Sequence, residues 1–240
     1  MKVMRWKRLT QPRFLFVYPL VLALFVFSQV TDASLRAGSV LILLGVALRV
    51  WANGYIGDRK VNETKGTGKV GQLMTAGPYA FVRHPLYLGS FLIGAGFCLT
   101  MGNLWVSLAA FAAFAGAYAD KMRQEDELLR AECGPAWVDY AAAVPQLIPR
   151  RRRYPHRRGQ WSWQGIAASK EWKTVSWVAV VMILVYFWKE TVQKHEGLFA
   201  ERPLYHLTLL GVAVALIAFD GLMELMTRRA KPQMIGREPA

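Results

Sequence analysis

Apolar residues along this chain gather in six blocks that are almost free of charge, and polar or basic segments separate them. Most blocks are ~15–23 residues long, close to the length that a helix needs to cross the ~30 Å hydrocarbon layer of a membrane. The pattern therefore predicts an all-α, polytopic helical membrane protein with about six transmembrane helices. The predicted spans are 14–30, 35–56, 86–101, 104–119, 174–188 and 204–226. The span at 174–188 is short, and it also fits a tilted or interfacial helix.

The overall composition agrees with a membrane protein. Hydrophobic residues make up 54% of the 240 residues and charged residues 19%, whereas charged residues form ~25% of an ordinary soluble domain. This composition argues against a soluble Rossmann or TIM-barrel enzyme, and also against a disordered or fibrous chain.

The net charge of +14 would suggest nucleic-acid binding in a soluble protein, but its distribution suggests membrane orientation instead. With a cytoplasmic N-terminus, the inner segments hold 25 of the 30 Lys and Arg residues. This asymmetry follows the positive-inside rule and predicts that both termini are cytoplasmic. We expect an integral protein of a bacterial inner membrane or an endomembrane. Its expected partners are membrane lipids and not nucleic acid.

The order of polar and apolar segments predicts three regions. Residues 1–56 form an N-terminal transmembrane hairpin, residues 57–153 form a core, and residues 154–240 hold a basic linker and a C-terminal transmembrane hairpin. Within the core, a second hairpin at 85–119 precedes cytoplasmic helices at about 119–132 and 136–143. Small residues such as Gly89, Gly94 and Gly96 predict that the two helices of this second hairpin pack closely.

The segment 77–89, with the sequence GPYAFVRHPLYLG, combines a turn with a helix start. Since proline disfavours a helical residue before it and is favoured at the first helical position, we expect His84 to be the N-cap and Pro85 to begin the helix. Free backbone N–H groups and the positive end of the helix dipole then favour a carboxylate or phosphate. The side chains expected around it are Arg83, His84, Tyr87 and Leu88, with room beside Gly89. Ordinary interfacial anchoring of the helix is an equal alternative.

A second polar stretch follows the fourth predicted span. Glu125 and Asp126 stand near the start of the charged helix, where a carboxylate would suit a bound cation. The alternative is a solvated helix face, on which these acids lie beside Lys121 and Arg130.

The two elements together are more specific than either alone. The pattern GPYxxxRHPxYxG, followed by an acidic pair and by Val144-Pro145-Gln146-Leu147-Ile148-Pro149, resembles the membrane methyltransferase family of isoprenylcysteine carboxyl methyltransferase and the phospholipid N-methyltransferases. The resemblance covers about residues 45–150.

This resemblance implies S-adenosylmethionine as cofactor, bound on the cytoplasmic side, and a lipophilic acceptor that arrives from the bilayer. The implied cofactor site contains Tyr79, Arg83, His84, Pro85, Tyr87, Leu88, Gly89, Glu125 and Asp126. Arg83, Tyr87 and Glu125 are the implied catalytic residues. The ligand fits these residue types, because Arg83 and the helix start suit its carboxylate, an acidic side chain suits its ammonium, and a tyrosine ring suits its sulfonium.

The chain departs from the family pattern at Ala143, where the prenylcysteine enzymes carry a basic residue before Val-Pro. This difference favours a lipid-like or small hydrophobic acceptor over a prenylated protein. Two alternative functions stay open: an NADPH-dependent enzyme similar to the integral sterol reductases, and a non-enzymatic membrane scaffold or small transporter.

Other ionisable and metal-binding residue types are few. Arg49 and Asp220 lie within predicted spans, where charged residues are candidates for function, and we consider that they pair with each other; snorkelling of Arg49 toward the interface is the alternative. The two cysteines, Cys98 and Cys133, lie in no metal-binding pattern, so no metal site is predicted.

Overall fold

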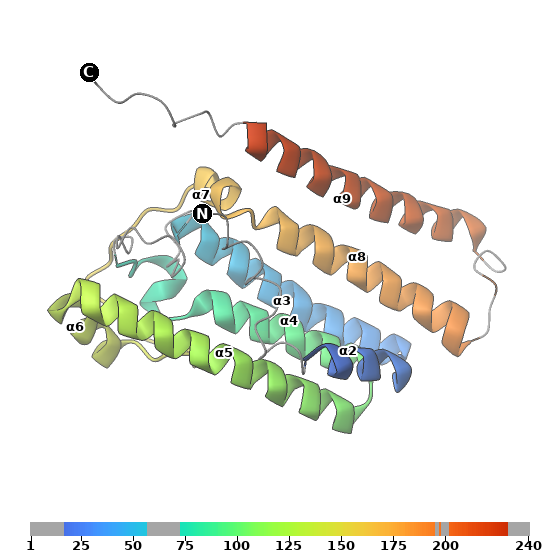
Figure 1. Cartoon of the computed structure of the whole chain (residues 1–240), viewed down its shortest axis with the longest axis horizontal. Coiled ribbons are helices and arrows are strands. Elements are labelled where there is room, and N and C mark those ends of the chain that lie inside the picture. Colours follow the sequence, from blue (N-terminus) through green and yellow to red (C-terminus); the bar gives the residue numbers. More distant parts are fainter. Residues whose placement is uncertain (1–16, 57–72, 195–196, 198–201, 230–240) are drawn as a thin grey trace, which may run out of the picture. The chain divides into compact units, whose positions relative to one another are not determined.

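The computed structural model describes residues 17–56, 73–194, 197 and 202–229, and within these residues the secondary structure is helical, without strands (Figure 1). The predicted all-α fold is therefore confirmed. The helices are α2 (Val17–Val26), α3 (Asp32–Ile56), the 3-10 turn η1 (Gly77–Ala80), α4 (Pro85–Met101), α5 (Leu104–Cys133), α6 (Pro135–Ala143), α7 (Trp163–Ser169), α8 (Trp172–Trp188), the π-helical turn η2 (Lys189–Gln193) and α9 (Pro203–Arg229).

Three described helices are long and apolar enough to cross a membrane, namely Asp32–Ile56, Trp172–Gln193 and Pro203–Thr227. The second of these is longer than the span predicted at 174–188, because η2 extends α8 to 22 residues. Helix α4 has 17 residues, which is ~26 Å at 1.5 Å per residue and slightly short of the hydrocarbon thickness. The protein thus has the helices of a membrane protein, and the count of about six spans stays a prediction.

The chain divides into two compact units, Met1–Glu171 and Trp172–Ala240. In the first unit α4 packs against both α3 and α5 (Figure 1). Helices α3 and α4 cross with their backbones in contact at two pairs of glycines. A Cβ on Gly38 would lie 2.5 Å from the carbonyl oxygen of Gly96, and one on Gly45 would lie 2.6 Å from that of Gly89. Close packing was predicted between α4 and α5, but two of the α4 glycines face α3.

Local signals set the ends of α4 and α5. Proline at position 85 begins α4 and His84 is its N-cap, as predicted. Gly102, with φ of 70°, ends α4, and the Asn103 side chain caps α5 by accepting a hydrogen bond from the Val106 N–H. Helix α5 then continues for 30 residues to Gly134. The apolar span at 104–119 and the charged helix at about 119–132 are therefore one uninterrupted helix.

The segment after α6 is docked onto the loop that precedes α4. Backbone N–H groups of Thr75 and Ala76 donate to the Arg158 carbonyl, and that of Tyr154 donates to the Ala80 carbonyl. A hydrophobic cluster forms under these hydrogen bonds, with members Leu73, Ala80, Tyr140, Val144 and Tyr154. Residues 154–171 thus belong to the first unit, although the sequence groups them with the C-terminal hairpin.

In the second unit α8 and α9 form a helical hairpin. Lys173 on α8 lies 3.0 Å from Glu224 and 3.9 Å from Asp220 on α9. The indole N–H of Trp177 also donates to Asp220, at 3.3 Å. The partners of Asp220 are thus residues of its own hairpin, in contrast to the predicted pairing with Arg49.

Candidate functional site

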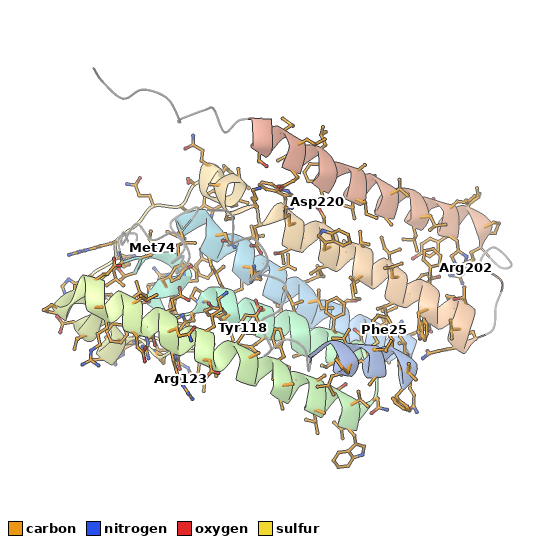
Figure 2. All side chains as sticks on the ribbon, in the orientation of Figure 1. Phe25, Met74, Tyr118, Arg123, Arg202 and Asp220 are labelled. Carbon is orange, nitrogen blue, oxygen red and sulfur yellow. The ribbon has the colours of Figure 1, made fainter. Side chains whose placement is uncertain are left out.

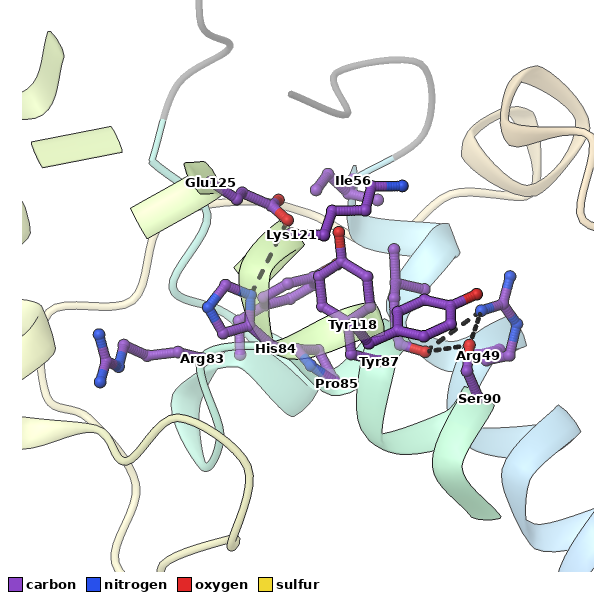
Figure 3. A pocket seen from close by; sticks show the side chains of 12 residues that line it. Arg49, Ile56, Arg83, His84, Pro85, Tyr87, Ser90, Tyr118, Lys121 and Glu125 are labelled. Atoms are coloured by element: carbon purple, nitrogen blue, oxygen red, sulfur yellow. Dashed lines mark hydrogen bonds and ion pairs between the residues drawn. The ribbon is translucent and has the colours of Figure 1, made fainter. Parts of the chain in front are cut away.

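A cavity of about 270 Å³ lies in the first unit where α3, η1, α4 and α5 meet (Figure 3). Its volume is close to the lower end of the ~300–1,000 Å³ range of small-molecule sites. Both polar and aromatic side chains line it: Arg49, Ile56, Tyr79, Arg83, His84, Pro85, Leu86, Tyr87, Ser90, Tyr118, Lys121 and Glu125.

Asp126 joins the two sequence elements that were predicted to form one site. Its carboxylate accepts a hydrogen bond from Arg83 Nη1 at 2.9 Å and lies 2.9 Å from His84 Nε2. Gln146, in the Val-Pro segment after α6, donates to the same carboxylate at 3.3 Å. The backbone also contributes, since the N–H groups of Arg83 and His84 donate to the carbonyls of Pro145 and Gln146. The start of α4, the acidic part of α5 and the Val-Pro segment are therefore held together.

The Arg83 guanidinium is engaged away from the cavity. It pairs with Asp126, and its Cζ lies 5.7 Å from the centre of the Trp137 ring. In Figure 3 its side chain extends away from the tyrosines. Lys121 is another cation on the cavity wall, with Nζ 5.9 Å from the centre of the Tyr87 ring. Lys121 therefore offers a cation to the cavity, whereas Arg83 is engaged by Asp126.

Glu125 presents its carboxylate to the cavity. One of its oxygens lies 4.0 Å from His84 Nδ1 (Figure 3), and the side chain is 23% exposed. The neighbouring His84 side chain is only 4% exposed. The first turn of α4 also borders the cavity through Pro85 and Leu86, and no side chain caps this helix start. The cavity thus combines a carboxylate with the positive end of a helix dipole.

Tyr79 has a buried hydroxyl that lacks a hydrogen-bond partner among the described residues. The residue is 6% exposed, and the Tyr140 hydroxyl fixes it in place by donating to the Tyr79 carbonyl at 2.7 Å. Burial and the nearby Glu125 raise the pKa of Tyr79 well above its ordinary value, so the hydroxyl stays protonated at neutral pH. An unsatisfied buried donor beside a cavity points to a ligand that would complete its hydrogen bond.

Aromatic rings form one wall of the cavity. The Tyr87 and Tyr118 rings meet edge to face with centroids 5.4 Å apart, and His84 packs on Tyr87 with centroids 5.5 Å apart. Tyr118 points from α5 toward α4, whereas Arg123, five residues further along, is 73% exposed and points outward (Figure 2). Such ring faces attract cations and accept flat aromatic groups.

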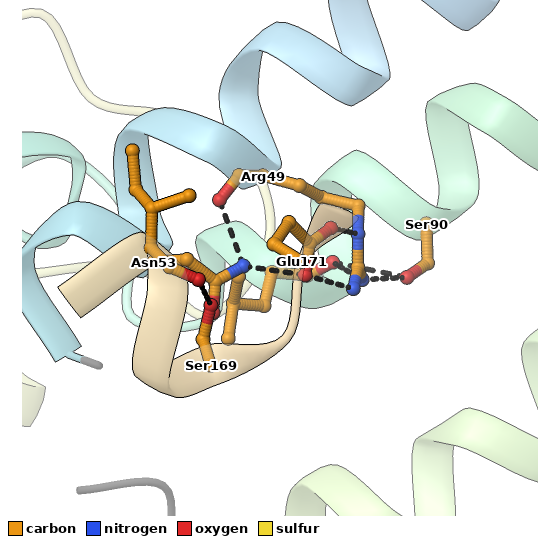
Figure 4. A network of polar contacts seen from close by, with 7 residues as sticks. Arg49, Asn53, Ser90, Ser169 and Glu171 are labelled. Atoms are coloured by element: carbon orange, nitrogen blue, oxygen red, sulfur yellow. Dashed lines mark hydrogen bonds and ion pairs between the residues drawn. The ribbon is translucent and has the colours of Figure 1, made fainter. Parts of the chain in front are cut away.

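Arg49 reaches the cavity from α3 and is paired with a residue near the end of the first unit. Its Nε and Nη2 atoms lie 2.6 and 3.0 Å from the two carboxylate oxygens of Glu171 (Figure 4). This pairing replaces the predicted one with Asp220.

The cavity includes six of the nine residues predicted for the cofactor site, namely Tyr79, Arg83, His84, Pro85, Tyr87 and Glu125. Leu88, Gly89 and Asp126 are not among its lining residues. A Cβ on Gly89 would meet the Arg49 side chain and the Gly45 carbonyl, so the space beside this glycine is filled by α3 and leaves no room for a flat ligand.

Several lining residues were not predicted from the sequence: Ile56, Leu86, Ser90, Tyr118 and Lys121. Two of them carried a signal. Tyr118, Lys121 and Glu125 are separated by three and four residues, which places them on one face of α5. This spacing is visible only if the helix is read as continuous across the boundary between its apolar and charged parts.

Comparison with known proteins supports the predicted resemblance. Residues 33–131 match the family model described as phospholipid methyltransferase. A protein-S-isoprenylcysteine O-methyltransferase of Schizosaccharomyces pombe is 31% identical over 77 residues, which cover 32% of this chain and 33% of that protein. The similarity to membrane methyltransferases is therefore confirmed, over a part of the chain that includes all of the lining residues of the cavity. No solved structure matches the chain significantly.

Two bacterial relatives bear names that refer to metals. The cobalt-zinc-cadmium resistance protein CzcN of Cupriavidus metallidurans is 35% identical over 125 residues. The nickel-cobalt-cadmium resistance protein NccN of Alcaligenes xylosoxydans xylosoxydans is 31% identical over 121 residues. Each match covers 50% of this chain and 52% of the relative, so the chain spans about half the length of these curated relatives. Among the described residues, no three His, Cys, Asp or Glu side chains converge as a metal site would require.

Proposed function

We propose that this chain is an integral membrane methyltransferase that uses S-adenosylmethionine and acts on a lipophilic acceptor. The observation that carries the proposal is the cavity in which the start of α4 meets Glu125 of α5, with the unpartnered hydroxyl of Tyr79 on its wall. All of these residues lie within the segment that matches the phospholipid methyltransferase model.

The side chains of the cavity fit the chemical groups of S-adenosylmethionine. Glu125 suits the ammonium group, while Lys121 and the first turn of α4 suit the carboxylate. Tyr79 donates a hydrogen bond to a polar atom of the ligand, and the Tyr87 and Tyr118 rings suit the flat adenine or the sulfonium. Arg83 contributes through Asp126, because that ion pair holds the α4 start against α5.

When bound, S-adenosylmethionine supplies a methyl group that is already activated by its sulfonium. The contribution of the protein is therefore placement, in which the ligand and the acceptor are held in line and water is excluded. Glu125, Tyr87 and the Arg83–Asp126 pair form the rigid frame that this placement needs, because α4 and α5 are tied at Asp126.

The acceptor in this proposal is lipid-like or a small hydrophobic molecule. The phospholipid and isoprenylcysteine methyltransferase matches favour such substrates, and apolar Ile56 and Leu86 line the same cavity as the charged groups. Ala143 stands before Val144, where a cation would favour a carboxylate substrate. The positive-inside distribution favours a cytoplasmic location for the cavity and for both termini.

Calorimetric titration of the purified full-length protein in detergent tests the proposal. We expect S-adenosylmethionine to bind and NADPH not to bind, since nothing in the matches favours the reductase alternative. Glu125→Gln should abolish or strongly weaken binding, while Glu127→Gln, on the exposed side of the same helix, should bind as the wild type does. Transfer of radiolabelled methyl groups into membrane lipid then tests the activity. Binding of NADPH alone, or of neither cofactor, would refute the assignment.

A further inference from the structure

The charged side chains that line the cavity do not balance one another. The ion-pair partners of the two arginines among them lie outside the cavity wall. Arg49, Arg83 and Lys121 are cations on its wall, and Glu125 is the carboxylate among the same lining residues. S-adenosylmethionine, the ligand of the proposed function on which this inference rests, carries a positive charge at its sulfonium. Uncompensated arginines beside the cavity would therefore oppose its binding.

Each arginine has its own carboxylate partner outside the cavity wall. Arg83 is paired with Asp126 at 2.9 Å, and both residues belong to the motifs identified in the sequence. Arg49 is paired with Glu171, which is 122 residues away in the sequence. With both arginines neutralised, Lys121 and Glu125 remain as one cation and one anion. The described residues that line the cavity then carry little net charge together.

The Arg49–Glu171 pair has the geometry of a fixed counter-ion (Figure 4). The carboxylate of Glu171 is 2% exposed and accepts hydrogen bonds from both Arg49 Nε and Nη2, and Asn53 Nδ2 donates a third at 2.7 Å. The other edge of the guanidinium faces α4, where Arg49 Nη1 donates to the Leu86 carbonyl at 3.2 Å and to Ser90 Oγ at 2.7 Å. Arg49 is thus held on both edges, with Leu86 and Ser90 themselves lining the cavity.

The chain between α6 and α8 is folded so that Glu171 reaches this position. The Ser162 N–H donates to the Gly54 carbonyl at 2.8 Å, which fixes the start of α7 against the end of α3. Lys170 then ends α7 in the left-handed conformation, with φ of 56°, and the next residue is Glu171. This segment lies outside the residues 33–131 that match the methyltransferase family model.

We propose that Glu171 is a positioning residue of the cavity, which cancels the charge of Arg49 and so allows a cationic sulfonium ligand to bind. The ligand pair S-adenosylmethionine and S-adenosylhomocysteine isolates this effect, because the second lacks the methyl group and the positive charge at sulfur. A purely structural role of Glu171 would change the affinity for both ligands by the same factor. A counter-ion role changes their ratio.

The test is calorimetric titration of the full chain in detergent with both ligands. Glu171→Gln removes the carboxylate that faces Arg49, so we expect the affinity for S-adenosylmethionine to fall on the order of 10-fold more than that for S-adenosylhomocysteine. Glu171→Asp keeps the charge and should keep the wild-type ratio. An unchanged ratio in Glu171→Gln overturns the inference while the proposed function stands. Failure of the wild type to bind either ligand overturns the proposed function itself.

A second variant covers the case in which loss of a buried ion-pair partner unfolds the protein. Ser90→Asp adds a carboxylate next to Arg49 Nη1, and Ser90→Asn is its uncharged match. The aspartate should shift the ratio in the opposite direction, so that S-adenosylmethionine gains relative to S-adenosylhomocysteine by a similar factor. Equal ratios in the two Ser90 variants overturn the inference even if Glu171→Gln cannot be purified.

Discussion

Replacement of Tyr79 by phenylalanine removes a single oxygen atom that has no hydrogen-bond partner among the described residues. A buried polar group without a partner costs a folded protein ~1–3 kcal/mol. Because Tyr79 is 6% exposed, the ligand-free variant should be as stable as the wild type or more stable by ~1 kcal/mol. Most tyrosine-to-phenylalanine changes at hydrogen-bonded sites have the opposite effect on stability.

Ligand binding should respond in the other direction. The Tyr79 hydroxyl is already dehydrated before the ligand arrives, so the hydrogen bond that it forms on binding carries little further desolvation cost. We expect the variant to lose ~1–2 kcal/mol of binding free energy, which corresponds to a Kd for S-adenosylmethionine that is ~5–30-fold higher.

Two measurements on the same preparation check both expectations: thermal unfolding without ligand, and calorimetric titration with S-adenosylmethionine. Tyr154→Phe is the matched control, since Tyr154 is buried beside Tyr140, with ring centroids 5.3 Å apart, and does not line the cavity. A Tyr79→Phe protein that is less stable without ligand and binds with unchanged affinity would show that the hydroxyl serves the fold and not the ligand.

Two further predictions concern stability. Asp126→Ala leaves the half-buried Arg83 and the buried His84 without their carboxylate, so it should lower the free energy of unfolding by ~1.5–3 kcal/mol in chemical denaturation, whereas Glu127→Ala should change it by less than ~0.5 kcal/mol. Gly45→Ala places a Cβ 2.6 Å from the Gly89 carbonyl oxygen and should cost ~1–3 kcal/mol. Gly116→Ala meets nothing within 4 Å and should stabilise α5 by up to ~1 kcal/mol in thermal unfolding. Equal stabilities in either pair would contradict the packing at Asp126 or at the α3–α4 crossing.

Residues with strong local preferences were predictable from the sequence. The proline at position 85 fixed the start of α4, and Gly102 and Gly134 ended α4 and α5 in left-handed or strained conformations that favour glycine. The resemblance to the membrane methyltransferases also implied that the GPY and acidic motifs belong to one site, and Arg83 and His84 do contact Asp126. The helix ends depend on neighbours within a few residues.

Features that depend on distant partners were not predictable in the same way. Nothing near Glu171 in the sequence indicates that it pairs with Arg49, because the pairing depends on the path of a segment more than 100 residues further along the chain. Gly89 was assigned to ligand contact, but a glycine on a helix permits close approach of a ligand and of another helix equally well. The tertiary arrangement decides between them, and here it brings α3 to this face.

The two glycine crossings of α3 and α4 also have a mechanical consequence. Gly38 and Gly45 each lie directly against a carbonyl group of the opposite helix, so neither helix can slide along the other without a steric clash. The side of the cavity that α3 and α4 form is therefore rigid. It holds Arg49 in a fixed position relative to the first turn of α4. Accommodation of ligands of different sizes has to come from the opposite side, through rotation of the Tyr118 and Lys121 side chains or bending of α5.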